Sequence, residues 1–170
     1  MANTNDLKNV IEPALLEGFR KSEKGHQVVQ TAALRRELFG MEFDGIGLQP
    51  QHKTLCFLEA TVSGYLGHNG RDFHIGASKK FADAFARFSI VMFPPTKAAL
   101  LKAATQEFAT DLENINCHLV VPKGSRFIRA LGYRTRLLEM GIMRVTEIEL
   151  PEEEREILMQ ALNAARDEMT

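Results

Sequence analysis

The chain has 170 residues, of which 45% are hydrophobic and 25% charged, and a formal net charge of -1 at pH 7. This length suits one sizeable core and is short for two, so we expect a single domain over residues 1–170. We find no run of about 18 uncharged apolar residues, and the polar N-terminus does not resemble a signal peptide. We therefore expect a cytoplasmic protein without membrane association. Cys56 and Cys117 stand far apart in apolar runs, so neither a disulfide framework nor a zinc knuckle is supported.

The charges are distributed unevenly along the chain. Residues 71–136 hold eleven lysines and arginines against five acids, whereas residues 137–170 hold nine acids against three bases. Bases gathered in one region can follow a phosphate backbone, but ordinary surface charge needs no partner, and only their positions in space separate the two interpretations. The bases of the middle third include Arg71, Lys79, Lys80, Arg87, Lys123, Arg126, Arg129, Arg134 and Arg136.

Hydrophobic periodicity and turn residues predict alternating elements along the chain. An antiparallel group of strands followed by alternating helices and strands indicates an α/β fold, in which a mixed β-sheet has helices on both faces. In chain order we expect a helix over 7–19, strands over 26–34, 42–48 and 55–62, helices over 78–92 and 96–112, a strand over 117–121, a helix over 127–138, a strand over 142–150 and a helix over 151–165.

The helix expected over residues 78–92 has an aromatic stripe. Phe81, Phe85 and Phe88 recur at helical spacing, and Pro94 and Pro95 end the helix. We expect all three phenylalanines to be buried against the sheet.

Two acids stand within neighbouring predicted strands. Residues 42–48 and 55–62 are joined by a short turn that contains Pro50, so we expect an antiparallel hairpin. The period of two places Glu59 on one face with Leu55 and Phe57. A carboxylate is costly to bury without a charge partner or a metal, so Asp44 beside Glu59 suggests a divalent-cation site.

On these residues the chain resembles the PD-(D/E)xK nuclease superfamily, and most closely the Mrr-like restriction endonuclease domains. The resemblance covers about residues 5–121: a helix, three strands with Asp44 in the second and Glu59 in the third, then a helix and an inner strand. It implies a restriction-endonuclease-like mixed sheet, Mg²⁺ or Mn²⁺ between the carboxylates, and cleavage of phosphodiester bonds in DNA. Thr61 replaces the lysine that the motif places two residues after Glu59.

Because the motif lysine is absent, the following helix is the next candidate source of a lysine. Some members of the superfamily take this lysine from the helix after the third strand, where Lys79 and Lys80 stand here. The expected catalytic residues are therefore Asp44, Glu59 and either of these lysines. Glu42, two residues before Asp44, is expected to share its face as a third metal ligand, and Glu12 is an alternative acid from the first helix.

Three interpretations remain open at this point. The first is a magnesium-dependent deoxyribonuclease that acts on DNA, with a homodimer as one oligomeric state open to it. The second is a catalytically degenerate nuclease-fold module, acting as a nucleic-acid-binding or protein-partner subunit, which Thr61 favours. The third is an unrelated α/β fold in which Glu59 pairs with an arginine such as Arg35 or Arg36. Carboxylates that converge with a lysine on one open pocket would support catalysis, whereas a salt bridge from Glu59 to an arginine would remove the metal site.

Overall fold

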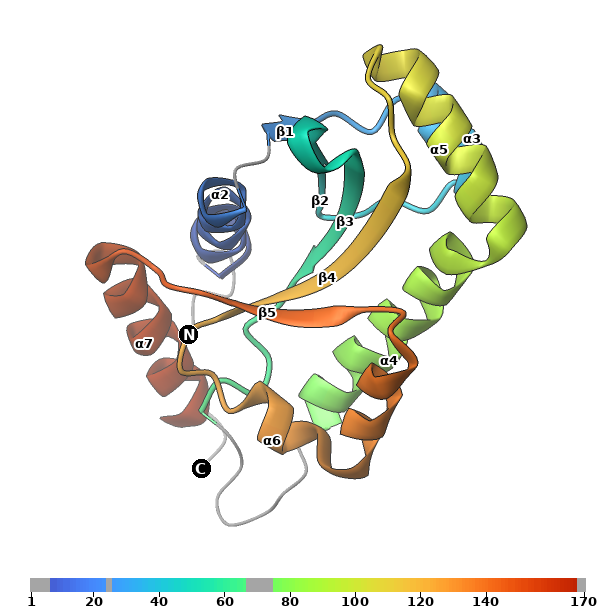
Figure 1. Ribbon diagram of the computed structural model, residues 1–170. Coiled ribbons are helices and arrows are strands. Elements are labelled where there is room, and N and C mark those ends of the chain that lie inside the picture. Colours follow the sequence, from blue (N-terminus) through green and yellow to red (C-terminus); the bar gives the residue numbers. More distant parts are fainter. Residues whose placement is uncertain (1–6, 24–25, 67–74, 168–170) are drawn as a thin grey trace.

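The fold is a mixed β-sheet between two layers of helices, as expected from the sequence (Figure 1). The computed structural model describes residues 7–23, 26–66 and 75–167. Among these residues, no helix combines the length and the apolar character needed to cross a membrane. The five strands lie in the order β1-β2-β3-β4-β5. Their bounds are β1 His26–Val28, β2 Gly45–Gln49, β3 Thr54–Ala60, β4 Asn114–Pro122 and β5 Arg144–Ile148.

Strand directions change in the middle of the sheet. β1, β2 and β3 pair antiparallel, whereas β3, β4 and β5 pair parallel. The predicted hairpin is confirmed: β2 and β3 are joined by the short helical turn η2, Pro50–His52, and Gly45 lies opposite Leu58. The strands are shorter than expected, because β2 begins at Gly45 rather than at residue 42 and β3 ends at Ala60.

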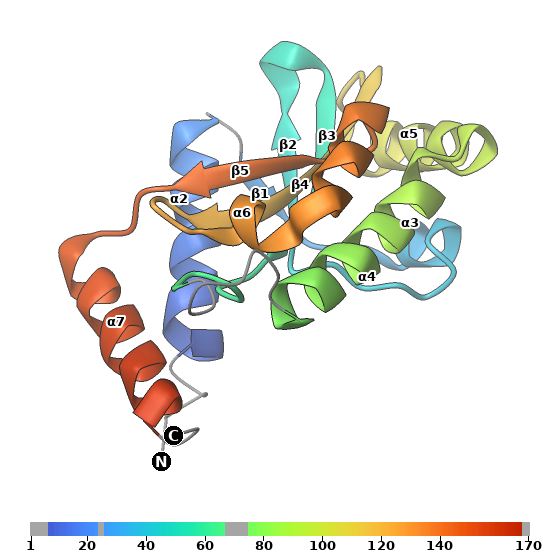
Figure 2. The ribbon, with the colours of Figure 1, turned by 90° about the horizontal axis from the view of Figure 1, so that it is seen from below.

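Each face of the sheet carries its own hydrophobic cluster. Leu55 and Phe57 pack on one side of β3, and Cys56, Leu58 and Ala60 pack on the other. This division confirms the alternation expected for β3. The first face is covered by α3 Ala32–Glu37, α4 Ile75–Met92, α5 Pro94–Phe108, α6 Phe127–Leu131 and η3 Gly132–Met140, and the second by η1 Leu7–Ile11, α2 Glu12–Ser22 and α7 Glu152–Asp167 (Figures 1 and 2).

The strand expected over residues 26–34 is wrong in its second half. β1 ends at Val28, and Thr31 begins the helix α3. The Thr31 hydroxyl accepts a hydrogen bond from the Leu34 amide at 3.3 Å, so Thr31 is the N-cap of α3. Thr31 is β-branched, which suggested a strand, but its hydroxyl forms this cap instead.

The aromatic stripe of α4 is confirmed for Phe81 and Phe88, which are fully buried. Phe85 is only partly buried, although its ring stacks on Phe81 with 6.1 Å between centroids. The helix also starts three residues earlier than expected.

Candidate metal and phosphate site

Asp44 and Glu59 meet at one end of the hairpin. Asp44 immediately precedes β2, and its Oδ2 accepts a hydrogen bond from the backbone amide of Ala60 at 2.8 Å. This hydrogen bond lies just beyond the last paired residues of β2 and β3. It holds the Asp44 carboxylate beside the end of β3. Asp44 is exposed to solvent, whereas Glu59 is 7% exposed on the face that α4 covers. The pair therefore has one carboxylate at the surface and one beneath it.

The pKa of Glu59 is raised from 4.5 to about 7. Burial is the largest cause, because it disfavours the ionised form, and the negative charge of Asp44 acts in the same direction. A hydrogen bond with Asp44 also favours the protonated form, while Arg87 and Lys80 favour the ionised one. Near neutral pH, Glu59 therefore exists in both its protonated and its ionised form.

Arg87 of α4 forms an ion pair with Glu59, its Nη1 donating to Oε1. The guanidinium carbon also lies 4.6 Å from the centre of the Phe43 ring. The third interpretation expected an arginine partner for Glu59, and the structure has one, although it is Arg87 rather than Arg35 or Arg36. This pair counts against a metal at Glu59. Arg35 pairs with Glu42 and Arg36 pairs with Glu37, both on the surface.

Sequence reasoning missed Arg87, although the sequence holds a signal for it. Arg87 follows Lys80 by seven residues, or about two helical turns, so both side chains leave the same face of α4. Two bases on one side of α4 can lie next to the two acids at the end of the β2–β3 hairpin.

The structure distinguishes between the two lysines at the start of α4. Lys80 lies close enough to Glu59 and to Glu12 to lower the pKa of each carboxyl group by its charge. Both lysines are exposed, and Lys79 is not among the groups that shift the pKa of Glu59 or Glu12. Lys80 is thus the better candidate for the displaced lysine of the motif.

Glu12 joins the cluster from the first turn of α2, on the opposite side of the sheet. Its pKa is raised, chiefly by burial and next by the charge of Asp44, whereas Lys80 opposes this effect. The charge of Lys80 therefore acts on two carboxyl groups, Glu12 of α2 and Glu59 of β3. The resemblance had offered Glu12 as an extra carboxylate from the first helix, and the structure brings it within range of the charges of Asp44 and Lys80.

Thr61 does not take over the role of the motif lysine. It is 2% exposed, and its hydroxyl accepts a hydrogen bond from the Ser63 amide at 3.1 Å. Its backbone amide donates to the Val120 carbonyl at 3.0 Å. Thr61 therefore helps to form the turn after β3, and the positive charge near Glu59 comes from α4.

Glu42 was expected to be a third metal ligand on the face of Asp44. The structure instead places its carboxylate 2.9 Å from Arg35 of α3, with 67% of the side chain exposed. Residues 42–44 precede β2 and are not part of the strand, so the period of two that supported this expectation does not apply to them. A role for Glu42 as a ligand stays a prediction without structural support.

The carboxylates of Asp44 and Glu59 suit a magnesium ion that is bound partly by the protein and partly by its substrate. Among the described residues, no group of three or more His, Cys, Asp and Glu side chains is arranged to hold a metal. Mg²⁺ is nevertheless commonly bound by one or two carboxylates together with waters and substrate phosphates. Asp44 and Glu59 supply two such carboxylates at one end of the hairpin, where Asp44 is exposed and Glu59 is buried.

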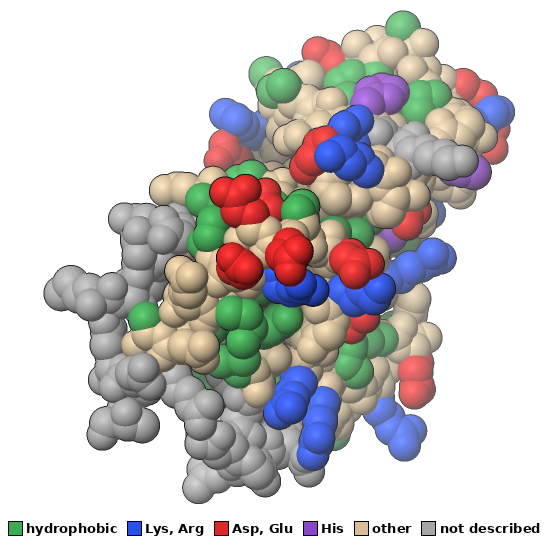
Figure 3. Space-filling view, turned by 90° about the vertical axis from the view of Figure 1, so that its left-hand side faces the viewer, with side chains coloured by type: hydrophobic (Ala, Val, Ile, Leu, Met, Phe, Trp, Pro, Cys, Tyr) green, Lys and Arg blue, Asp and Glu red, His purple; other side chains and the backbone are tan. Residues whose placement is uncertain are grey.

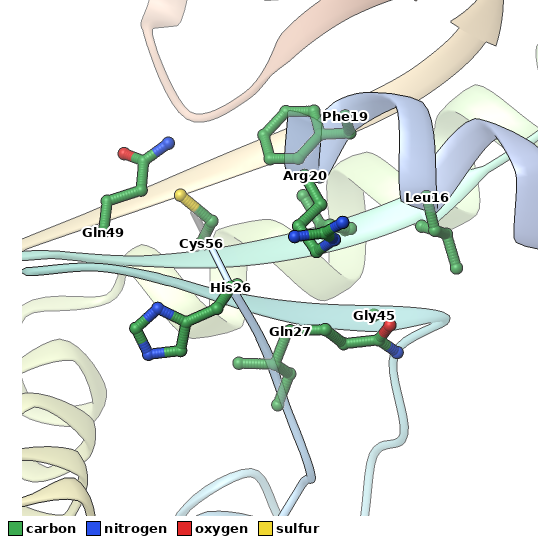
Figure 4. Close-up of a pocket in the computed structure, with 11 residues that line it drawn as sticks. Leu16, Phe19, Arg20, His26, Gln27, Gly45, Gln49 and Cys56 are labelled. Carbon is green, nitrogen blue, oxygen red and sulfur yellow. The ribbon is translucent and has the colours of Figure 1, made fainter. Parts of the chain in front are cut away.

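A small hollow lies under α2, on the face of the sheet opposite α4 (Figure 4). Leu16, Phe19 and Arg20 from α2 face Cys56 from β3 across it. Its cavity volume of about 10 Å³ leaves room for one water molecule and not for a substrate. Burial raises the pKa of Cys56 to about 12, so this thiol stays protonated and unreactive. The hollow is therefore part of the hydrophobic packing.

Many bases of the middle third lie on neighbouring elements. α6 packs against α4, and η3 follows α6 directly, so the three elements that carry these bases are neighbours in space (Figure 2). The face formed by α2 and α7 is different, because acidic side chains gather across its middle with bases beside them (Figure 3). α7 contributes Glu152, Glu153 and Glu154 in its first turn. Arg71 falls outside the described residues.

Comparisons with protein-family models, with curated proteins and with solved structures find no match to this chain.

Proposed function

We propose that the protein is a magnesium-dependent nuclease that cleaves phosphodiester bonds in DNA. The observation that carries this proposal is the meeting of Asp44 and Glu59 at one end of the hairpin, with Lys80 of α4 beside them. A mixed sheet flanked by helices, as the resemblance to PD-(D/E)xK nucleases implies, supports the same proposal.

Each residue has a distinct task in this proposal. Asp44 and Glu59 hold the ion, and the amide of Ala60 keeps the Asp44 carboxylate in position. Mg²⁺, when bound, supplies charge neutralisation for a phosphate and lowers the pKa of water. Lys80 stabilises the negative charge that develops on the attacked phosphate, as the motif lysine is expected to do. The bases of α4, α6 and η3 attract the DNA backbone.

A plasmid-nicking assay tests this assignment. We expect cleavage by the wild-type protein with Mg²⁺ or Mn²⁺ and none with EDTA or in Asp44→Asn, because one carboxylate does not retain the ion. Lys80→Ala should lower the rate by about 10²-fold and leave Mn²⁺ binding in place, since ammonium assists the transition state without coordinating the ion.

Two matched variants control for the loss of a surface lysine. Lys79→Ala removes the neighbouring charge on the same helix, and Lys102→Ala removes an exposed charge on α5. Both should cut DNA at close to the wild-type rate. Equal losses in Lys79→Ala and Lys80→Ala would refute the specific role of Lys80.

The second candidate is a module that retains the fold and binds a partner without cleaving it. The ion pair between Glu59 and Arg87 favours it, because this pair satisfies the buried carboxylate without a metal. The use of Thr61 in a turn favours it as well. EDTA-insensitive DNA binding by a wild-type protein that cuts no nucleic acid would establish this candidate in place of the nuclease.

A further inference from the structure

Arg87 is held in place by two different kinds of contact. The edge of its guanidinium donates to Glu59, and its face lies 4.6 Å from the centre of the Phe43 ring. Asp83, one helical turn earlier on α4, lies 4.0 Å from the same nitrogen and is mostly exposed. The side chain of Arg87 is itself 22% exposed, so it lies at the boundary between core and solvent.

The aromatic contact of Arg87 rests on a rigid support. The Phe43 ring stacks on Phe88 with 5.6 Å between centroids and an angle of 7°, and it packs at 58° on Phe57. Phe57 and Phe88 are fully buried. The face of the guanidinium can therefore stay on Phe43 even when its edge changes partner, because a cation above an aromatic ring is favoured whether or not the edge is paired.

A divalent ion and Arg87 compete for the same carboxylate. With a divalent ion held by Asp44 and Glu59, the Glu59 carboxylate would no longer be available to Arg87, and like charge would disfavour the guanidinium at the same oxygen. The edge of Arg87 would then be free to donate to a substrate phosphate at this site. A guanidinium presents a planar fork of donors that matches two phosphate oxygens, and this fork distinguishes it from lysine.

We propose that Arg87 is the phosphate-binding residue of this site: it neutralises Glu59 while no metal is present and binds the substrate phosphate once a metal occupies Glu59. This inference rests on the proposed nuclease function and goes beyond it. It assigns the Glu59–Arg87 pair to the metal-free form of the site, and it gives the partly buried arginine a direct contact with the DNA backbone.

The test measures Mn²⁺ affinity by calorimetry and single-turnover nicking at saturating Mn²⁺. Arg87→Gln should bind Mn²⁺ about tenfold more tightly, because the competing charge is gone. It should nick DNA at least about tenfold more slowly, because a charged hydrogen bond to the phosphate is lost. Arg87→Lys should keep the wild-type Mn²⁺ affinity and still nick slowly, since it retains the charge and loses the fork.

Arg155→Ala serves as the matched control, because it removes an exposed arginine paired with Glu152 on α7. Thermal melting of each variant confirms that it is folded under the assay conditions, and Arg87→Lys provides the test should Arg87→Gln not fold. Unchanged Mn²⁺ affinity in Arg87→Gln, or wild-type nicking by Arg87→Lys, would overturn the inference and leave the nuclease intact. A wild-type protein that neither binds Mn²⁺ nor nicks DNA would overturn both.

Discussion

Truncation of Phe88 to alanine is expected to lower the free energy of unfolding by about 3–5 kcal/mol. Phe88 is fully buried in the cluster between α4 and the sheet, and it stacks on Phe43. Its removal leaves a cavity that the surrounding side chains fill only in part, because α4 is held against α5 and α6. Urea denaturation followed by circular dichroism measures the loss.

Phe85→Ala is the matched control for this prediction. Phe85 lies on the same helix but is only partly buried, so its truncation should cost clearly less than that of Phe88. If the two variants lose the same stability, or if Phe88→Ala unfolds at the wild-type urea concentration, the described packing of α4 on the sheet is wrong.

Glu59 is expected to make stability depend on pH between about 4.5 and 7. The folded state raises its pKa to about 7, so between these values the folded state binds a proton that the unfolded state has released. The contribution of Glu59 is complete below about pH 4.5 and is lost as the pH rises towards 7. A shift of this size corresponds to a loss on the order of 3 kcal/mol. Burial is the largest cause of this shift, Asp44 adds to it, and the positive charges of Arg87 and Lys80 oppose it.

Glu59→Gln should remove this dependence, because an amide does not titrate. We expect the free energy of unfolding of the wild type to fall relative to that of Glu59→Gln between pH 4.5 and 7, and to stay parallel to it above that range. Glu156→Gln on the exposed side of α7 controls for the loss of one acid. Parallel curves for the wild type and Glu59→Gln across the whole range would show that Glu59 is ionised in the folded state at pH 5.

The hairpin and its face pattern were predictable because they depend on local signals. The period of two in residues 55–60 separates two hydrophobic faces, and Pro50 marks the turn, so the position of Glu59 followed directly. Residues 29–34 were predicted wrongly, because a short run with β-branched residues suits either a strand or a helix start. The cap formed by Thr31 decides between them, and that cap requires the backbone of Leu34.

The adjacency of Asp44 and Glu59 was predictable from the sequence, whereas the partners of Glu59 were not. The rotation of α4 relative to the sheet decides that Lys80 and Arg87, rather than Lys79, face the acids. This rotation depends on the packing of Phe81 and Phe88 against strands that are distant in sequence. The pairing of Glu42 with Arg35 likewise depends on α3, which the sequence pattern did not indicate.

A manganese-soaked crystal tests the central claim most directly, through the anomalous signal of the ion. The account predicts an anomalous peak within bonding distance of carboxylate oxygens of both Asp44 and Glu59, with the guanidinium of Arg87 withdrawn from Glu59 and still above the Phe43 ring. The absence of a peak at these two carboxylates, with Glu59 still paired to Arg87, would contradict the account.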